Sequence, residues 1–324
     1  MNKQNQILTV LLAIQIVVLA IVFWPSSPAS SRGRLFGDIS ADQVVRVTVH
    51  GPDGEQVVME RDSAERWVLP EADDYPVNEE QVVALLDKIV DISGDRLVTK
   101  TSGSHKRLKV ADDDFEGLVE FELADGAQHK LYLGTTSSYQ VLHVRAGNED
   151  AVHLALGLTS YEARADVAAW IDPVYLSIPQ AEIVAVTLTN QNGHLEFVKD
   201  AAGAWTMQGL AAGETLNQNN VISLANRASS LHMQRPLGRE EQASYGFDAA
   251  AAVIAIQTQS AEGEGAHHIV RVGALLEDGY VVKSVTSPYY VLMADYAVSS
   301  FVEDARQDFL ELPPTPEPEP ATTP

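Results

Sequence analysis

Hydrophobic and polar residues alternate along several short stretches of this chain. Val45, Val47 and Val49 occupy every second position, and Val184 begins a similar stretch further along the chain. Side chains two positions apart lie on the same face of a β-strand. A turn-forming sequence follows each stretch, GPDG at 51–54 and NQNG at 190–193, and hydrophobic residues then resume. The pattern predicts antiparallel hairpins near residues 44–59 and 183–197.

Two longer stretches carry hydrophobic residues at helical spacing. An asparagine stands before each of them, Asn78 and Asn217, at the position that caps a helix N-terminus. Gln81 occupies the place of the reciprocal partner in a capping box. The hydrophobic positions form one stripe in each helix: Val82, Leu85, Leu86, Ile89 and Val90 in the first, and Val221, Leu224, Ala225 and Ala228 in the second.

Further helices are expected near residues 170 and 309. Thr159 and Glu162 form an S/T-x-x-E capping box, which predicts a helix that runs through Trp170. A second stripe near the C-terminus predicts another helix, and its members are Val298, Phe301, Val302, Ala305 and Phe309.

These elements recur at an interval of about 139 residues. The matched landmarks are Trp67 with Trp205, Asn78 with Asn217, Gly134 with Gly273, and Trp170 with Phe309. A period this long is too large for a solenoid repeat and fits duplicated domains. We therefore predict an α+β fold made of two tandem repeats, residues 41–177 and 178–311, each an antiparallel sheet with covering helices.

The two tryptophan steps differ in the loop that follows them. Trp67 and Trp205 could serve as ligand platforms, but their matched placement favours burial in the core of each repeat. The loop after Trp67 contains PEADDYPV and is acidic, whereas the one after Trp205 contains GLAAGETL and is nearly neutral. If this segment has a role beyond folding, the difference between the loops indicates where it lies.

The N-terminal region predicts a membrane anchor. Residues 7–24 carry no charge and would span about 27 Å as a helix, close to the thickness of a bilayer core. We expect an uncleaved anchor at 7–24, rather than a removed signal peptide, with a cytoplasmic tail at 1–6 and a linker at 25–40. The body would then lie in the periplasm, attached to the inner membrane. Residues 312–324 are rich in proline and glutamate and predict a disordered tail.

Composition excludes several classes of function. The net charge is -23 over 324 residues, and such a surface repels nucleic acid and anionic lipid, so binding to either by charge attraction is not expected. The chain contains no cysteine, which removes disulfides, thiolate nucleophiles and cysteine metal sites. We expect no nucleic-acid partner.

The candidate chemical motifs are weak. Asp112, Asp113, Asp114 and Glu116 form an acidic run that lacks the register of an EF-hand loop, so cation binding by Asp112–Asp114 stays open and a solvated turn is favoured. His267 and His268 are adjacent and would diverge in a strand. Ser102, Ser104 and His105 are neighbours in sequence, which is not the geometry of a catalytic triad. We predict no catalytic, cofactor-binding or metal-binding residues, and no enzyme activity.

The chain resembles the bacterial domain-of-unknown-function family 4340. That resemblance rests on the duplicated tryptophan step, on Tyr245–Asp248 (YGFD) where the family has Y-G-L-D, and on the hairpin that ends at Gly273. The first repeat departs from it, with KRLK at Lys106–Lys109, although Trp67 and Gly134 fit. The resemblance implies one N-terminal membrane segment, an extracytoplasmic body and a link with gliding-motility-type ABC transporters.

Two functions follow as expectations. The first is a non-enzymatic accessory or interaction protein, anchored through residues 7–24, with an ABC permease or ATPase or another envelope subunit as partner. The alternative is a periplasmic ligand-binding receptor that uses the cleft between the two repeats. An envelope hydrolase is a third and weaker hypothesis.

Overall fold

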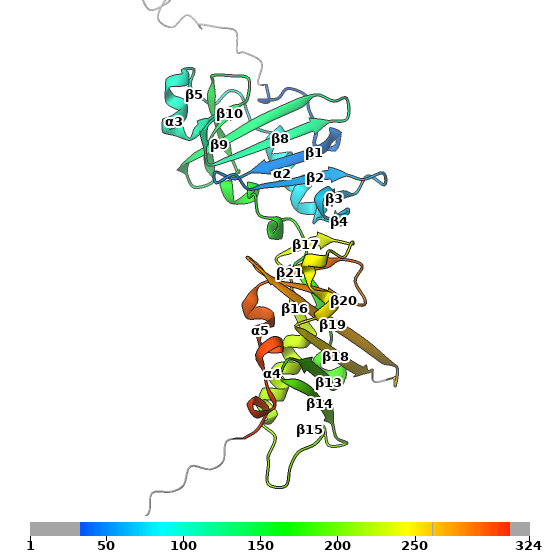
Figure 1. The fold of residues 1–324 in the computed structure, drawn as a ribbon. Helices are drawn as coiled ribbons and strands as arrows, with labels where there is room; N and C mark the ends of the chain where they lie inside the picture. The colour runs from blue at the N-terminus through cyan, green and yellow to red at the C-terminus, as the bar shows by residue number, and fades with distance from the viewer. Residues whose placement is uncertain (1–32, 261, 312–324) are drawn as a thin grey trace, which may run out of the picture. The chain divides into compact units, whose positions relative to one another are not determined.

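Two large antiparallel sheets form most of the structure, a computed structural model that describes residues 33–260 and 262–311 (Figure 1). The first sheet has nine strands in the order β4-β3-β2-β1-β8-β9-β10-β11-β5. Its strands are β1 (Val44–His50), β2 (Gln56–Arg61), β3 (Trp67–Leu69), β4 (Tyr75–Pro76), β5 (Leu97–Thr99), β8 (Gly117–Leu123), β9 (Gln128–Ser138), β10 (Val141–Ala146) and β11 (Val152–Leu156).

The second sheet has eight strands in the order β15-β14-β13-β18-β19-β20-β21-β17. They are β13 (Ile183–Asn190), β14 (Gly193–Lys199), β15 (Trp205–Met207), β17 (Arg235–Gly238), β18 (Ala252–Gln259), β19 (Gly265–Leu276), β20 (Gly279–Ser284) and β21 (Tyr290–Met293). Two small two-stranded sheets complete the strands: the hairpin of β6 (Val110–Ala111) with β7 (Asp114–Phe115), and β12 (Val174–Ser177) paired with β16 (Ser230–His232), which follows it after three strands and an α-helix.

Helices are few within the described residues. The α-helices are α2 (Glu79–Val90), α3 (His105–Leu108), α4 (Gln218–Ser229) and α5 (Asp295–Glu303). The 3-10 helices are η1 (Ala41–Gln43), η2 (Pro70–Ala72), η3 (Ser102–Ser104), η4 (Ser160–Ala163), η5 (Val167–Ala169), η6 (Gln180–Glu182), η7 (Ala243–Tyr245), η8 (Phe247–Ala249) and η9 (Arg306–Phe309). The fold is therefore mixed α+β, and strands dominate it.

The predicted hydrophobic stripes are buried in the two longest helices. All five predicted positions of α2 are at most 4% exposed, and all four of α4 are at most 4% exposed. The predicted asparagine caps are present: the Asn78 side chain accepts a hydrogen bond from the Gln81 amide at 3.4 Å, and Asn217 accepts one from Asn220 at 3.2 Å. The reciprocal bond expected of Gln81 is not formed, because the Asn78 amide donates to the Trp170 carbonyl. Local pattern and capping chemistry were sufficient to predict both helices.

Equivalent backbone bonds occur in both halves of the chain. The Asn78 amide donates to the Trp170 carbonyl at 2.6 Å, and the Asn217 amide donates to the Phe309 carbonyl at 2.8 Å. Donor and acceptor both shift by 139 residues. The two sheets and these paired contacts are consistent with a tandem repeat.

A second pair of contacts explains two glycines. A Cβ added to Gly134 would lie 2.1 Å from the Leu108 carbonyl oxygen, and one added to Gly273 would lie 2.1 Å from that of Tyr245. Only glycine permits so close an approach of another backbone. The structural counterpart of YGFD is therefore Leu108–Ala111 (LKVA), two residues further along than the KRLK segment expected from the sequence. In this register Lys109 (φ 55°) adopts the left-handed conformation that Gly246 (φ 73°) adopts in the second copy.

The helix predicted from Thr159 to Trp170 is wrong. Glu162 does accept hydrogen bonds from Thr159, but two short 3-10 helices, η4 and η5, follow instead of an α-helix. The Asp166 side chain takes the Ala168 amide at 3.0 Å, and the Trp170 indole donates to the Arg164 carbonyl at 2.8 Å. In an α-helix the Ala168 amide would donate to the Arg164 carbonyl, but both groups already have other partners, so the α-helix does not form there.

The helix predicted around Val298–Phe309 is also interrupted. Helix α5 ends at Glu303, and η9 begins at Arg306. The Asn190 side-chain amide, which comes from β13, donates to the carbonyls of Phe301 at 2.9 Å and Asp304 at 2.8 Å. A long-range partner satisfies the carbonyls at the end of the helix, so the chain turns there.

The chain divides into two compact units, Met1–Val44 with Ala84–Ala163 and Val45–Val83 with Arg164–Pro324. No helix among the described residues combines the length and hydrophobicity that a membrane crossing requires. The predicted anchor at 7–24, the tail at 1–6 and the tail at 312–324 lie outside the described residues.

Candidate functional site

Both repeated tryptophans are core residues. Trp67 is 1% exposed and Trp205 is 5% exposed, as the matched placement predicted. A cation lies over each ring, Arg61 at 5.1 Å from the Trp67 ring and Lys199 at 5.1 Å from the Trp205 ring. The tryptophans are therefore structural residues of the core and do not form an exposed ligand platform.

The loop after Trp67 folds into η2 and β4. Asp73 (φ 53°) and Asp74 (φ 58°) are both left-handed, a conformation that aspartate tolerates better than most residues. The short strand β4 pairs with β3 through Val68 and Pro76. This acidic loop is thus an ordered structure at the end of the sheet.

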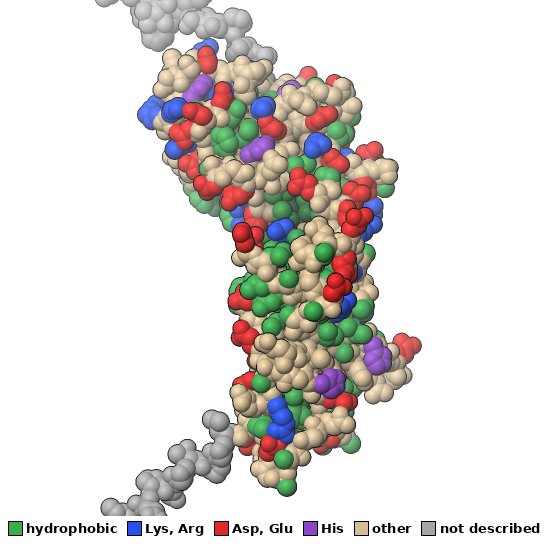
Figure 2. Space-filling view, viewed as in Figure 1, with side chains coloured by type: hydrophobic (Ala, Val, Ile, Leu, Met, Phe, Trp, Pro, Cys, Tyr) green, Lys and Arg blue, Asp and Glu red, His purple; other side chains and the backbone are tan. Residues whose placement is uncertain are grey.

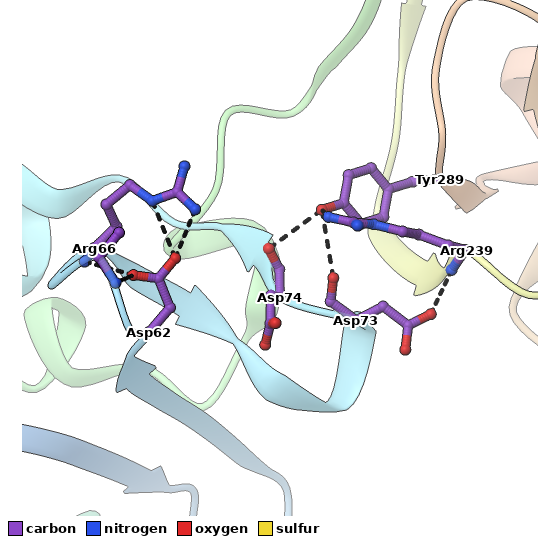
Figure 3. A network of polar contacts seen from close by, with 7 residues as sticks. Asp62, Arg66, Asp73, Asp74, Arg239 and Tyr289 are labelled. Atoms are coloured by element: carbon purple, nitrogen blue, oxygen red, sulfur yellow. Dashed lines mark hydrogen bonds and ion pairs between the residues drawn. The ribbon is translucent and has the colours of Figure 1, made fainter.

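Asp73 makes the first contact of a polar cluster (Figure 3). Its carboxylate accepts a hydrogen bond from the Arg239 backbone amide at 2.6 Å. Gly238, with φ of 99°, precedes that amide, and a Cβ there would lie 2.6 Å from the same carboxylate oxygen. The close approach of the carboxylate to the end of β17 therefore requires glycine at 238.

Tyr289 completes the cluster. The Arg239 guanidinium donates to the Tyr289 hydroxyl at 2.6 Å and lies 4.8 Å from the centre of its ring. The hydroxyl donates to the Asp74 carbonyl oxygen at 3.2 Å, and that of Asp73 is 3.4 Å away. We call Asp73, Asp74, Gly238, Arg239 and Tyr289 the Asp73 clasp. All of its residues belong to the unit formed by Val45–Val83 and Arg164–Pro324.

Aromatic packing and burial surround the clasp. The rings of Tyr75 and Tyr289 meet edge to face, with centroids 4.7 Å apart. Burial raises the pKa of Tyr75 to about 12, and nearby Asp172 adds to the shift. The Tyr289 hydroxyl raises the pKa of Arg239, so the guanidinium stays charged throughout the physiological range. The positive charge of Arg239 is thus constant near neutral pH.

A second ion pair, drawn in Figure 3, shapes the turn before Trp67. Arg66 donates to the Asp62 carboxylate at 3.0 Å from Nε and 2.6 Å from an Nη atom. These bonds lower the pKa of Asp62. Asp62 also accepts the amides of Ala64 and Arg66, so its carboxylate organises the turn.

A cavity of about 270 Å³ adjoins the clasp loop. Its walls come from β2, β3 and η2 and from β17 and η7, within the same unit as the clasp. Arg235 and Glu71 contribute charges of opposite sign, and Gln56 and Gln242 contribute amides. The remaining lining residues are Val57, Val58, Leu69, Ala72, Val167, Pro236, Leu237 and Tyr245. The cavity can therefore accept a small ligand that has both polar and apolar parts.

The predicted acidic run does not converge on one point. Asp112 pairs with Arg145, Asp113 with Lys106 at 2.8 Å, and Asp114 with Lys109 at 2.7 Å. Arg145 lowers the pKa of Asp112, and Lys106 lowers that of Asp113. Across residues 33–260 and 262–311, no three potential ligand side chains come close enough to hold a metal ion.

The remaining motif residues are also separate. His105 is buried, and its Nε2 atom bonds to the Asp150 backbone carbonyl at 3.0 Å. Ser104 approaches Thr101 instead, at 3.4 Å between hydroxyl oxygens. His267 and His268 lie in β19, opposite Gln257 and Ile256 of β18. Each motif thus serves its own part of the fold.

Sequence reasoning identified one side of the clasp and missed the other. The contrast between the two loops drew attention to Asp73 and Asp74. Gly238, Arg239 and Tyr289 lie in segments without a recognisable pattern, more than 160 residues away in the sequence. Nothing in the sequence distinguishes Gly238, which has a left-handed backbone, from a glycine in an ordinary turn.

Comparison with known proteins identifies a family and no nearer relative. A model of the family described as a domain of unknown function (DUF4340) matches residues 67–301. Neither the curated proteins nor the solved structures yielded a match. The matched region covers more than half of the chain and includes both large sheets in major part, so this protein belongs to the DUF4340 family.

Proposed function

We propose that this protein is a non-enzymatic accessory protein of the cell envelope. In this proposal residues 7–24 anchor the chain in the inner membrane, and the body lies in the periplasm. Its partners are subunits of an ABC-type transporter, a permease or an ATPase, or of a related envelope complex. Family membership and the resemblance described above support this assignment.

The observation that carries the proposal is the state of the ionisable groups. A catalytic acid or base needs a pKa close to the working pH. In this body the pKa values of Asp62, Asp112, Asp113, Glu162 and Glu214 are lowered. Those of several lysines, arginines and tyrosines are raised, among them Lys106, Lys109, Arg306 and Tyr290. These shifts move the groups away from neutrality and fix their charges.

Two groups shift the other way and are held by structural contacts. Burial raises the pKa of Asp304, whose carboxylate lies 3.7 Å from Arg227. Burial lowers the pKa of Lys283, which donates to the Ser287 carbonyl. The polar side chains of these groups thus serve the architecture through ion pairs and hydrogen bonds, which supports a role in binding partners.

The test is recovery of the partners from membranes. The full chain with an affinity tag would be cross-linked in cells, solubilised and purified, and its partners identified by mass spectrometry. We expect an ABC permease or ATPase. A control in which an unrelated apolar span replaces residues 7–24 separates contacts of the body from contacts of the anchor. Recovery of no transporter or envelope subunit with either form would contradict the proposal.

The cavity beside the clasp favours a second function, that of a ligand receptor. Arg235, whose guanidinium lies 3.8 Å from Asp278, contributes a positive charge to the wall, and apolar residues line much of the rest. An arginine is suited to a carboxylate ligand. A ligand present at 100 times its dissociation constant would stabilise the protein by about 2.7 kcal/mol. A thermal-shift screen of envelope metabolites and cations, repeated with Arg235→Met, distinguishes this function, because specific binding should weaken in the variant.

A further inference from the structure

We propose that one surface of the unit Met1–Val44 with Ala84–Ala163 rests on the anionic lipid surface of the membrane in which the chain is anchored. We call it the β5 patch, and it consists of Arg96, Leu97, Val98, Lys100, Tyr139 and Leu156. The proposal rests on the anchor at residues 7–24 in the function proposed above. It goes beyond that function by assigning a lipid-binding surface to the body.

The first step is the place where the chain joins this unit. Arg34 forms a bridge with Ser93, the Gly94 amide donates to the Gly33 carbonyl at 3.0 Å, and Arg34 pairs with Asp91 at 2.8 Å. Residues 33–35 are therefore fixed against residues 91–94. Strand β5 begins only three residues after Gly94, a distance of about 10 Å along an extended chain.

The second step is the reach of the connection. Trp24 ends the predicted span and Gly33 is the first described residue. Even a fully extended chain would cover no more than roughly 32 Å between them. The β5 edge of the sheet is thus held close to the membrane surface, and a tether of this length raises the effective concentration of a weak contact into the millimolar range.

The third step is the exposure of apolar side chains at this edge. Leu97 is 44% exposed, Val98 41%, Leu156 50% and Tyr139 87%. Strand β5 is the last strand of the sheet and pairs with β11 through Leu97 and His153. Leu156 pairs with Val141 of β10, and the Gly157 amide donates to the Gln140 carbonyl beside Tyr139. The four side chains therefore belong to adjoining backbone segments. Leu97 and Val98 are adjacent in a strand and point to opposite faces of the sheet, so the surface they share is its edge at β5.

The fourth step is charge. Residues 95–109 contain five of the 22 basic residues of the chain and a single acid, Asp95. Lys106 and Lys109 are paired with Asp113 and Asp114, but within the described residues no ion pair involves Arg96, Lys100 or Arg107. Figure 2 shows Lys and Arg side chains grouped over α3, which follows β5. This concentration is a local exception in a chain whose net charge is -23.

Together these features match a membrane surface. Tyrosine and leucine side chains suit the interface between headgroups and acyl chains, and arginine and lysine bind anionic headgroups. Glu149 and Asp150 lie in the turn beside His105, so charge alone is not strong there. The anchor supplies proximity, and the patch supplies orientation.

The chain has no cysteine, so single cysteines can be labelled without background. Full-length Tyr139→Cys and Leu156→Cys would carry an environment-sensitive fluorophore in nanodiscs of phosphatidylglycerol and phosphatidylcholine. Two controls are matched to them. Tyr296→Cys replaces a tyrosine of α5 that is also 87% exposed. Asp125→Cys lies in the exposed turn at the opposite end of β9, about 35 Å along the strand from Tyr139.

We expect blue-shifted emission and loss of most of the emission with a nitroxide-labelled lipid at positions 139 and 156, and little change at 125 and 296. Arg96→Glu with Lys100→Glu should reduce the quenching in anionic discs and leave it unchanged in purely phosphatidylcholine discs. Equal quenching at all four positions, or none at 139 and 156 while the chain migrates with the discs, would overturn the patch alone. Shielding that appears only after membrane extract is added would assign the patch to a protein partner and overturn the lipid assignment. A chain that fails to migrate with the discs would overturn the anchor itself.

Discussion

The Asp73 clasp makes a prediction that separates a hydrogen bond from the backbone conformation that presents it. Asp73 contributes in two ways: its carboxylate accepts the Arg239 amide at 2.6 Å, and its backbone is left-handed, with φ of 53° and ψ of 52°. Three substitutions divide these roles. Asp73→Ala loses the acceptor and disfavours the backbone, Asp73→Gly loses the acceptor and favours the backbone, and Asp73→Asn keeps an acceptor oxygen.

The magnitudes follow from the geometry. A hydrogen bond to a charged group contributes about 1.5–3 kcal/mol, and the exposure of Asp73 places this one near the lower limit. A left-handed alanine costs roughly 1–2 kcal/mol, whereas aspartate offsets part of that cost and glycine avoids it. We therefore expect a loss of unfolding free energy of about 2.5 kcal/mol for Asp73→Ala, and of about 1 kcal/mol or less for Asp73→Gly and Asp73→Asn.

Two measurements on the full chain check this prediction. Urea titration gives the ranking of the variants, and Trp67 reports locally because it lies on β3, directly before the loop. Hydrogen exchange reads the Arg239 amide itself. Its exchange should rise about tenfold in Asp73→Ala and Asp73→Gly, since 1.4 kcal/mol corresponds to a factor of ten, and should change little in Asp73→Asn. If glycine proved as destabilising as alanine, or if the amide exchanged equally in all variants, the reasoning would be refuted.

Three further predictions concern the rest of the body. Gly134→Ala and Gly273→Ala should each lower the melting temperature strongly, with losses of more than about 3 kcal/mol, because each new Cβ meets a backbone oxygen at 2.1 Å; a mild effect at either position would contradict the contact. Arg306 lowers the pKa of Glu214 from 4.5 to about 2, so the stabilisation from the ionised Glu214 is complete above about pH 4.5 and disappears as the pH falls towards 2. Glu214→Gln should therefore flatten that part of an acid-unfolding curve. An unchanged curve would argue against the ion pair. Gln218→Ala should lower the free energy of unfolding by about 1–3 kcal/mol, because it leaves the amide and the carbonyl of Trp205 unpaired on an edge strand. It should also increase aggregation, measured by light scattering. Gln218→Glu keeps an acceptor for the Trp205 amide and should have a smaller effect.

Sequence patterns predicted those parts of the fold that depend on neighbours in the chain. The stripes of α2 and α4, their asparagine caps and the hairpins of β1 and β13 all follow from spacing that a local reading detects. The helix expected after Thr159 failed although Glu162 accepts the Thr159 amide as in a capping box. Asp166 and the Trp170 indole engage the backbone groups that the next helical turn would need. Helix α5 ended early because Asn190, more than 100 residues away, binds its last carbonyls. The spacing of hydrophobic residues gives no information about such competing hydrogen bonds.

The candidate site was only half predictable for the same reason. Asp73 and Asp74 stand out because their loop differs between the two copies, but their partners Arg239 and Tyr289 carry no motif. The acidic run at 112–114 shows the opposite failure. Three adjacent carboxylates suggested one cation site, and folding assigns each of them to a different basic side chain.

The loops after the two tryptophans solve one physical problem in two ways. Strands β3 and β15 are equivalent, and each would present unpaired backbone groups beside its tryptophan if it ended its sheet uncovered. In the first copy β4 pairs with β3, and the Val77 amide donates to the Trp67 carbonyl at 3.2 Å. In the second copy the Gln218 side chain accepts the Trp205 amide at 2.9 Å and donates to its carbonyl at 2.8 Å. A single side chain covers what a whole loop covers in the other copy. The first loop can therefore extend to the Asp73 clasp without exposing its sheet, because β4 within that loop already covers β3.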